Sequence, residues 1–196
     1  MRKNKYHLLI WCLSLMTVLL SACGENADFR YSDFHPNLTI DNSLHLDATL
    51  ASGMNALSPG IFVIVQATNK GGAYYFTFQN NQGLRSEKRF TAIDVRLQNQ
   101  LHMGMNNGVI VGYGNLDNPS IFFAYDQQCP NCFDYNVLPV KNFPLAFDGY
   151  GYATCRHCNR SYNLNTDGNI VKGQGGKPLT RYRAATTGAN GILRVN

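Results

Sequence analysis

The sequence lacks several patterns that would place it in a common class of proteins. It has no internal repeat, no low-complexity tract and no long stretch of helical periodicity, which argues against solenoids and helical bundles. It also has no glycine-rich phosphate loop, no Ser-His-Asp order and no paired-carboxylate motif. Nucleotide binding, serine hydrolysis and glycoside hydrolysis therefore have no supporting motif.

The first residues have the features of an export signal. Three basic residues precede an apolar run from Leu8 to Leu20, and small residues follow it. A charged start, an apolar centre and a small-residue end are typical of a signal peptide. The run is shorter than the roughly 20 residues that a transmembrane helix needs. We interpret residues 1–22 as a signal peptide.

The end of this segment resembles the lipobox of bacterial lipoproteins, through Leu20-Ser21-Ala22-Cys23. The resemblance implies that Cys23 is lipidated and is the first residue of the mature chain. It implies a protein of the bacterial cell envelope, held by lipid at the outer membrane or facing the periplasm. Residues 23–36 then form a polar tether. The alternative is an ordinary secretory signal in which Cys23 is incidental.

Setting the signal aside changes the charge and the cysteine count. The net charge of +5 falls to +2, because three basic and no acidic residues belong to that segment. Charge therefore gives no indication of a nucleic-acid partner. Of the six cysteines, Cys12 leaves with the signal and Cys23 is used by the lipid. The remaining four thiols all lie in two Cys-x-x-Cys pairs.

The rest of the chain predicts an all-β fold. Short apolar or alternating segments recur at close intervals, separated by Gly, Asn and Pro turns, as in β-sandwiches and barrels. Residues 44–57 are ambiguous between a strand at 44–46 and a short helix. The expected strands are residues 38–40, 61–65, 73–78, 91–97, 108–113, 121–125, 137–140, 150–154, 161–164, 170–171, 178–184 and 192–195.

The two cysteine pairs, Cys129-Pro130-Asn131-Cys132 and Cys155-Arg156-His157-Cys158, have metal-ligand spacing. Two residues between cysteines let both sulfurs of a tight turn point at one ion, and two such pairs complete a tetrahedral site. Each pair follows an expected strand. We therefore predict a metal site formed by Cys129, Cys132, Cys155 and Cys158 on adjacent loops.

Two thiol chemistries are alternatives to metal binding. In an extracytoplasmic protein, a disulfide between Cys129 and Cys132 or between Cys129 and Cys155 is possible. Cys129-Pro130-Asn131-Cys132 also has the spacing of a thioredoxin-type redox motif, which would make the protein a thiol-disulfide oxidoreductase. The residues after Cys132 do not resemble a helix start, which disfavours the redox motif.

The second half of the chain resembles the Rieske iron-sulfur domain. The resemblance follows Tyr125-Asp126, Cys129-Pro130, the run from Cys155 to Leu164, Gly168, Gly173 and the run from Pro178 to Arg183. It covers residues 59–184 and is specific from Tyr125 onward. It implies a Rieske-like β-sandwich over residues 37–196, with a small rubredoxin-like or zinc-ribbon-like metal subdomain at about 125–165.

The ligands depart from the Rieske pattern. A Rieske cluster needs a His in each loop, but Asn131 stands in place of the first His, Cys158 in place of the second, and His157 is one residue out of register. The usual high-potential cluster is therefore not predicted. Four thiolates suit Zn²⁺, and they also suit a single iron or an all-cysteine [2Fe–2S] cluster.

The export signal favours zinc among these metals. It lacks the twin-arginine pair typical of proteins exported with a cluster already inserted, since Arg2-Lys3 is not such a pair. A chain exported unfolded must acquire its metal afterward, which is simpler for one ion. We predict structural zinc in a non-enzymatic envelope lipoprotein that acts as a binding or interaction module, with an unknown protein partner. The alternative is an electron-transfer protein with iron or [2Fe–2S] in the same site.

The half of the chain that carries the predicted site is positively charged. From Tyr125 to Asn196 there are eight Lys or Arg against four acidic residues, which suits a site whose four thiolates leave Zn²⁺ with a net negative charge. Arg156, His157 and Arg160 are candidates for contacts around the sulfurs, the alternative being a solvated basic face. His35, His45 and His102 have no ligand-spaced partner and are expected at the surface.

Overall fold

A computed structural model describes residues 30–196, of which Tyr31–Asn196 form one compact unit. The predicted signal peptide and the lipidated Cys23 lie outside the described residues. The compact unit begins inside the segment interpreted as a tether, and Tyr31 forms a bridge with Arg181. Within the described residues, no helix is both long enough and apolar enough to cross a membrane.

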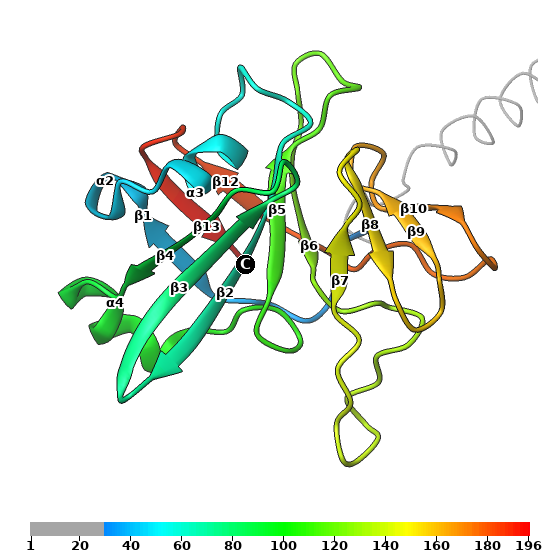
Figure 1. The fold of residues 1–196 in the computed structure, drawn as a ribbon, viewed down its shortest axis with the longest axis horizontal. Helices are drawn as coiled ribbons and strands as arrows, with labels where there is room; N and C mark the ends of the chain where they lie inside the picture. Colours follow the sequence, from blue (N-terminus) through cyan, green and yellow to red (C-terminus); the bar gives the residue numbers. More distant parts are fainter. Residues whose placement is uncertain (1–29) are drawn as a thin grey trace, which may run out of the picture. The chain divides into compact units, whose positions relative to one another are not determined.

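Three antiparallel sheets contain most of the regular secondary structure in the described residues, in agreement with the predicted all-β class (Figure 1). The largest has six strands in the order β11-β6-β5-β2-β3-β4. Their bounds are β2 Phe62–Lys70, β3 Ala73–Asn80, β4 Arg85–Arg89, β5 Val109–Tyr113, β6 Phe122–Asp126 and β11 Arg181–Tyr182.

Two smaller sheets accompany the six-stranded sheet. One has the order β1-β13-β12, with β1 Leu38–Asp41, β12 Ala184–Thr186 and β13 Ile192–Val195. The other has the order β10-β9-β8-β7, with β7 Leu145–Phe147, β8 Tyr152–Cys155, β9 Ser161–Asn163 and β10 Asn169–Lys172. The helical segments are short: α2 Asn42–His45, α3 Ala48–Gly53, α4 Ala92–Leu97 and the 3₁₀ turn η2 Gln98–Gln100.

Strand β2 separates two hydrophobic cores because its side chains alternate between the faces of the sheet. Val63 and Val65 lie in the core formed with β1, β13 and α3. Phe62 and Ile64 lie in the core formed with β7, β8 and β9. All four are buried. The second core contains Cys129 and Cys155, so the four-stranded sheet carries the predicted metal site onto one face of the six-stranded sheet.

The prediction of a strand at residues 91–97 is wrong, because this segment contains helix α4. The Thr91 side chain accepts a hydrogen bond from the backbone N–H of Asp94, and the Asp94 side chain accepts one from the N–H of Thr91. This reciprocal capping box satisfies backbone donors that a helix start would otherwise leave unpaired. The alternating residues Ile93, Val95 and Leu97 are all exposed.

The prediction of a strand at residues 137–140 is also wrong. These residues lie in an exposed loop, and Leu138 is 83% exposed. The strand that precedes the second cysteine pair is instead β7, which begins seven residues after Leu138. Its first residue, Leu145, packs into the second core. The ambiguous segment 44–57 contains the end of α2 and all of α3. Each helix is capped by an aspartate: Asp41 accepts from Ser43 N–H and Asp47 from Leu50 N–H.

Leu50 provides a test of the first core. It is fully buried in α3 against the six-stranded sheet, so Leu50→Ala should lower the free energy of unfolding by about 2–5 kcal/mol. Leu57→Ala is the matched control, because Leu57 is 92% exposed and its truncation should change stability by less than about 0.5 kcal/mol. Urea denaturation followed by circular dichroism measures both. Equal effects would contradict the described packing.

Candidate metal centre

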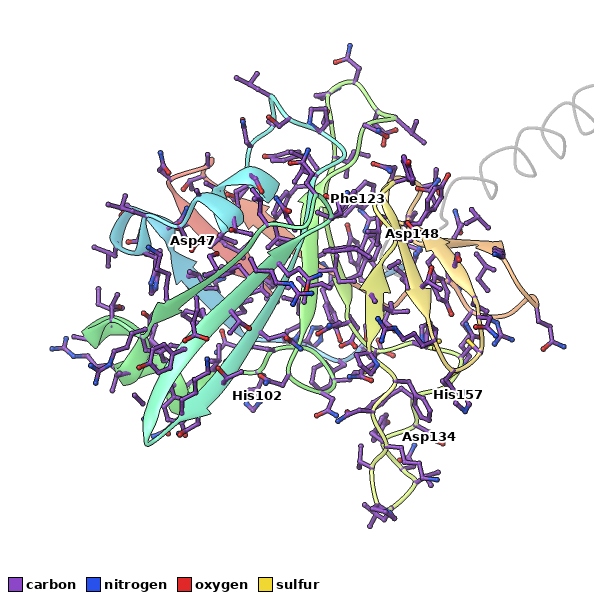
Figure 2. The ribbon with its side chains drawn as sticks, in the orientation of Figure 1. Asp47, His102, Phe123, Asp134, Asp148 and His157 are labelled. Atoms are coloured by element: carbon purple, nitrogen blue, oxygen red, sulfur yellow. The ribbon has the colours of Figure 1, made fainter. Side chains whose placement is uncertain are left out.

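Two loops bring the four cysteines together. Cys129 lies three residues after the end of β6, and Cys132 lies in the turn that follows. Cys155 is the last residue of β8, and Cys158 lies in the turn between β8 and β9. We call residues 129–132 the first knuckle and residues 155–158 the second. Figure 2 labels Asp134, just beyond the first knuckle, and His157, inside the second. The predicted arrangement of both pairs at strand ends on neighbouring loops is confirmed.

The four sulfur atoms converge on one point. All lie within 4.8 Å of one another, with Cys129 Sγ 3.7 Å from Cys158 Sγ and Cys132 Sγ 3.9 Å from Cys155 Sγ. Both short distances join one knuckle to the other. Four sulfurs bound to one ion at about 2.3 Å lie about 3.8 Å apart at the corners of a tetrahedron. The group could therefore hold a metal ion.

The backbone forms a tight turn at each knuckle. In the first, the N–H groups of Cys132 and Phe133 donate to the carbonyl of Cys129 at 3.1 and 2.9 Å. In the second, Asn159 N–H donates to the carbonyl of Cys155 at 2.9 Å, and Asn159 has a φ of +56°. Asparagine tolerates this left-handed conformation better than most residues. The turns direct both sulfurs of each pair to the same side.

None of the four cysteines forms a disulfide. Cys129 and Cys155 are buried, and Cys132 and Cys158 are partly exposed. Burial raises the pKa of the Cys129 thiol to about 11. Burial also acts to raise the pKa of Cys158, but hydrogen bonds from the side chain and backbone of Arg160 outweigh it and lower that pKa to about 6. The site therefore contains both a stabilised thiolate and thiols that need a cation to ionise.

A tyrosine and an asparagine brace the first knuckle from outside the ligand set. Asn131 Nδ2 donates to Tyr162 Oη at 2.9 Å and to the carbonyl of Lys177 at 2.7 Å. Because Tyr162 Oη accepts from Asn131, its own proton is available to Cys129 Sγ, 3.2 Å away. Asn131 Oδ1 also accepts from Lys177 N–H at 2.9 Å. The network connects the first knuckle to β9 and to the segment before β11.

Gly176 permits this close approach. A Cβ at position 176 would lie 2.2 Å from Asn131 Oδ1, so any other residue would force the Asn131 side chain to move. The sequence interpretation placed Asn131 at a vacant ligand position and did not identify its role with Tyr162. Asn131 contacts Tyr162, which lies 31 positions later in the chain, and Lys177, which lies 46 positions later. No local sequence pattern could have indicated these contacts.

The three residues predicted around the sulfurs occupy different places. Arg160 hydrogen-bonds to Cys158, and it also donates through Nε to the carbonyl of Gln174 at 2.8 Å. Arg156 is exposed and lines a cleft beside β7. His157 is exposed, and its ring lies 4.7 Å from that of Phe143. Of the three, Arg160 is the one that hydrogen-bonds to a sulfur.

One histidine expected at the surface is buried. His45 in α2 is 6% exposed, and its Nε2 lies 3.0 Å from Asp94 Oδ2 in α4. The two residues are far apart in sequence, so the prediction from ligand spacing was wrong for His45. His35 and His102 are exposed, as expected.

Tyr162→Phe tests the contact with Cys129. Removing the hydroxyl deletes a hydrogen bond to a ligand sulfur, so we expect the affinity for Zn²⁺ to fall by about 10-fold to 100-fold. Tyr125→Phe is the control, because its buried hydroxyl donates to the Leu164 carbonyl at 2.9 Å and not to a sulfur. Competition with a chromophoric chelator measures both affinities. An equal loss in both variants would mean that the effect is one of general stability.

Comparison of the chain with family models, with curated proteins and with solved structures finds no match. The resemblance to the Rieske domain thus stays a prediction from the sequence, and the function has to be argued from the site itself.

Proposed function

We propose that Cys129, Cys132, Cys155 and Cys158 bind one Zn²⁺, which acts as a structural clip in a lipid-anchored protein of the bacterial cell envelope. The observation that carries the proposal is the convergence of four sulfur atoms within 4.8 Å of one another. Zn²⁺ prefers closed tetrahedral sites of four thiolates in structural roles. A closed site has no open position for substrate, which supports a non-enzymatic function.

The spacing of the sulfurs supports one ion over a cluster. In a [2Fe–2S] cluster, two irons and two bridging sulfides separate the two pairs of thiolates. Sulfurs on different irons then lie farther apart than sulfurs on one ion. Here every pair of the four sulfurs lies within 4.8 Å, a spacing that supports one shared ion.

The position of the site supports a role in holding the chain together. Residues 127–144, between β6 and β7, contain no helix or strand and carry the first knuckle. Cys129 N–H and the Phe143 carbonyl hydrogen-bond at 2.9 Å where this loop leaves and rejoins the sheets. An ion shared with Cys155 and Cys158 would tie the loop to the β8–β9 hairpin. Metal binding to such a site contributes directly to folding.

A single redox-active iron is the second candidate. It uses the same tetrahedral geometry, and the partial exposure of Cys132 and Cys158 would allow electrons to leave the site. A thiol-disulfide oxidoreductase has less support, because the residues after Cys132 do not begin a helix and so lack the helix terminus that activates the thiol in such enzymes.

Metal analysis tests the proposal. We expect purified protein to be colourless with one zinc per chain, and Cys155→Ser to lose the ion. Zinc at a thousand times its dissociation constant should stabilise the metal-free protein by about 4 kcal/mol, measured by thermal unfolding with and without chelator. Visible absorption with bound iron would favour the electron carrier. Protein with no metal and fewer than four free thiols would indicate a disulfide.

The anchor needs its own experiment, because Cys23 lies outside the described residues. We expect the full chain, expressed in a Gram-negative host, to partition into the detergent phase of Triton X-114 and to carry lipid on Cys23 by mass spectrometry. Cys23→Ser should move the protein to the aqueous phase without changing its zinc content. Cleavage of the natural chain at another residue, with no lipid, would contradict the lipoprotein assignment.

A further inference from the structure

A large polar cleft lies between the six-stranded sheet and strand β7. Its volume is about 830 Å³. It is separate from the smaller pocket that Cys132 lines. One wall is formed by β2, β3 and β4, and the other by β7 with Arg156. Nothing in the proposed zinc clip explains a cleft of this size.

The first wall belongs to the face of the six-stranded sheet that packs into the second core. This face is apolar where the four-stranded sheet covers it and polar beyond that point. Ile64 of β2 is buried in the second core, and the next residue on the same face is Gln66. Gln66 pairs with Thr77 of β3, and the neighbouring pair across β3 and β4 is Gln79 with Arg85. The four-stranded sheet covers the start of this face and leaves its amides, hydroxyl and guanidinium open to the cleft.

The second wall presents a strand edge that is open at Phe147. Strand β7 is the last strand of its sheet. Asp148 N–H donates to the Tyr152 carbonyl on β8, and Leu145 N–H points the other way, to the Gln127 carbonyl at 2.8 Å. In an antiparallel ladder these directions alternate, so the N–H and C=O of Phe147 point away from β8. Phe147 lines the cleft and can accept a further strand there.

The two walls carry unpaired positive charge. Arg85 and Arg156 come from opposite walls, and neither forms an ion pair with any residue in 30–196. The acidic residue of the cleft, Glu87, is already paired with Lys70. The cleft is therefore suited to carboxylates, which guanidinium groups bind with two parallel hydrogen bonds.

We infer that this cleft binds an extended peptide segment with acidic side chains. A strand added at Phe147 gains main-chain hydrogen bonds, as in other cases of β-augmentation. Because side chains of a strand alternate, acidic residues can face Arg85 and Arg156 while the alternate residues contact Phe147. A main-chain edge in the same cleft as two guanidiniums favours a peptide over other carboxylate polymers.

This inference rests in one respect on the proposed function. Arg156 lies between the ligands Cys155 and Cys158, so an ion in the site would fix the backbone from which Arg156 reaches the cleft. The bound ion would then position a residue of the binding site, Arg156, in addition to stabilising the fold. Arg85, on β4, does not depend on the ion.

The probe is a fluorescein-labelled peptide of alternating Glu and Val, eight residues long, with its Gln-Val counterpart as the neutral control. We expect fluorescence anisotropy to show binding of the acidic peptide only. Arg85→Gln and Arg156→Gln should each weaken it about tenfold or more, as expected for a hydrogen bond to a charged group. Arg194→Gln, on β13 and exposed, should leave it unchanged.

The strand edge is tested separately. Phe147→Pro removes the outward N–H and leaves the bonds to β8, so it should bind more weakly than Phe147→Ala. Equal binding by these two variants, equal binding of the neutral peptide, or unchanged binding by both arginine variants would overturn the inference. Stronger binding of polygalacturonate than of the peptide would overturn the choice of a peptide.

Measuring peptide binding with and without zinc separates this inference from the proposed function. Chelated protein should bind the acidic peptide as weakly as Arg156→Gln does, with circular dichroism checking that the sheets persist. Protein that contains no metal yet binds the peptide through both arginines would refute the clip and retain the cleft. Zinc-loaded protein that fails to bind any acidic peptide would refute the cleft and retain the clip.

Discussion

The convergence of four thiols at one point is the constraint on which the second half of the chain depends. Each sulfur belongs to a different position in the chain, yet all lie within 4.8 Å of one another. Thiolates at this spacing repel one another and are stabilised together only by a cation. The loop after β6, the β8–β9 turn and the contacts of Tyr162 and Arg160 all serve to keep this geometry.

Most strands could be predicted from the sequence, because buried strands such as β2 and β5 are rich in β-branched residues between turn signals. Helix α4 could not be predicted from alternation, since the alternating residues Ile93 and Val95 are both exposed. The capping pair of Thr91 and Asp94 indicates the start of this helix, and a search for hydrophobic periodicity does not detect such a pair. Strand β7 has only three residues, too few to show a period.

The four-cysteine group could be predicted because its spacing is local, and the residues around it could not. Arg160 follows the second knuckle and was a natural candidate, whereas Tyr162 and Asn131 meet only through the pairing of β8 with β9 and the fold of the loop. His45 and Asp94 meet for the same kind of reason, across two helices separated by three strands. Spacing reveals ligands within one turn, and topology determines their neighbours.

The charged strand β4 has a consequence for how copies of this protein meet one another. It ends the six-stranded sheet, and its sequence Arg85-Ser86-Glu87-Lys88-Arg89 places charge at four of five positions. Pairing two such edges would bring like charges into contact, and natural sheets use this device against aggregation. Growth of one sheet into a fibre is therefore disfavoured at β4, even where chains are crowded side by side.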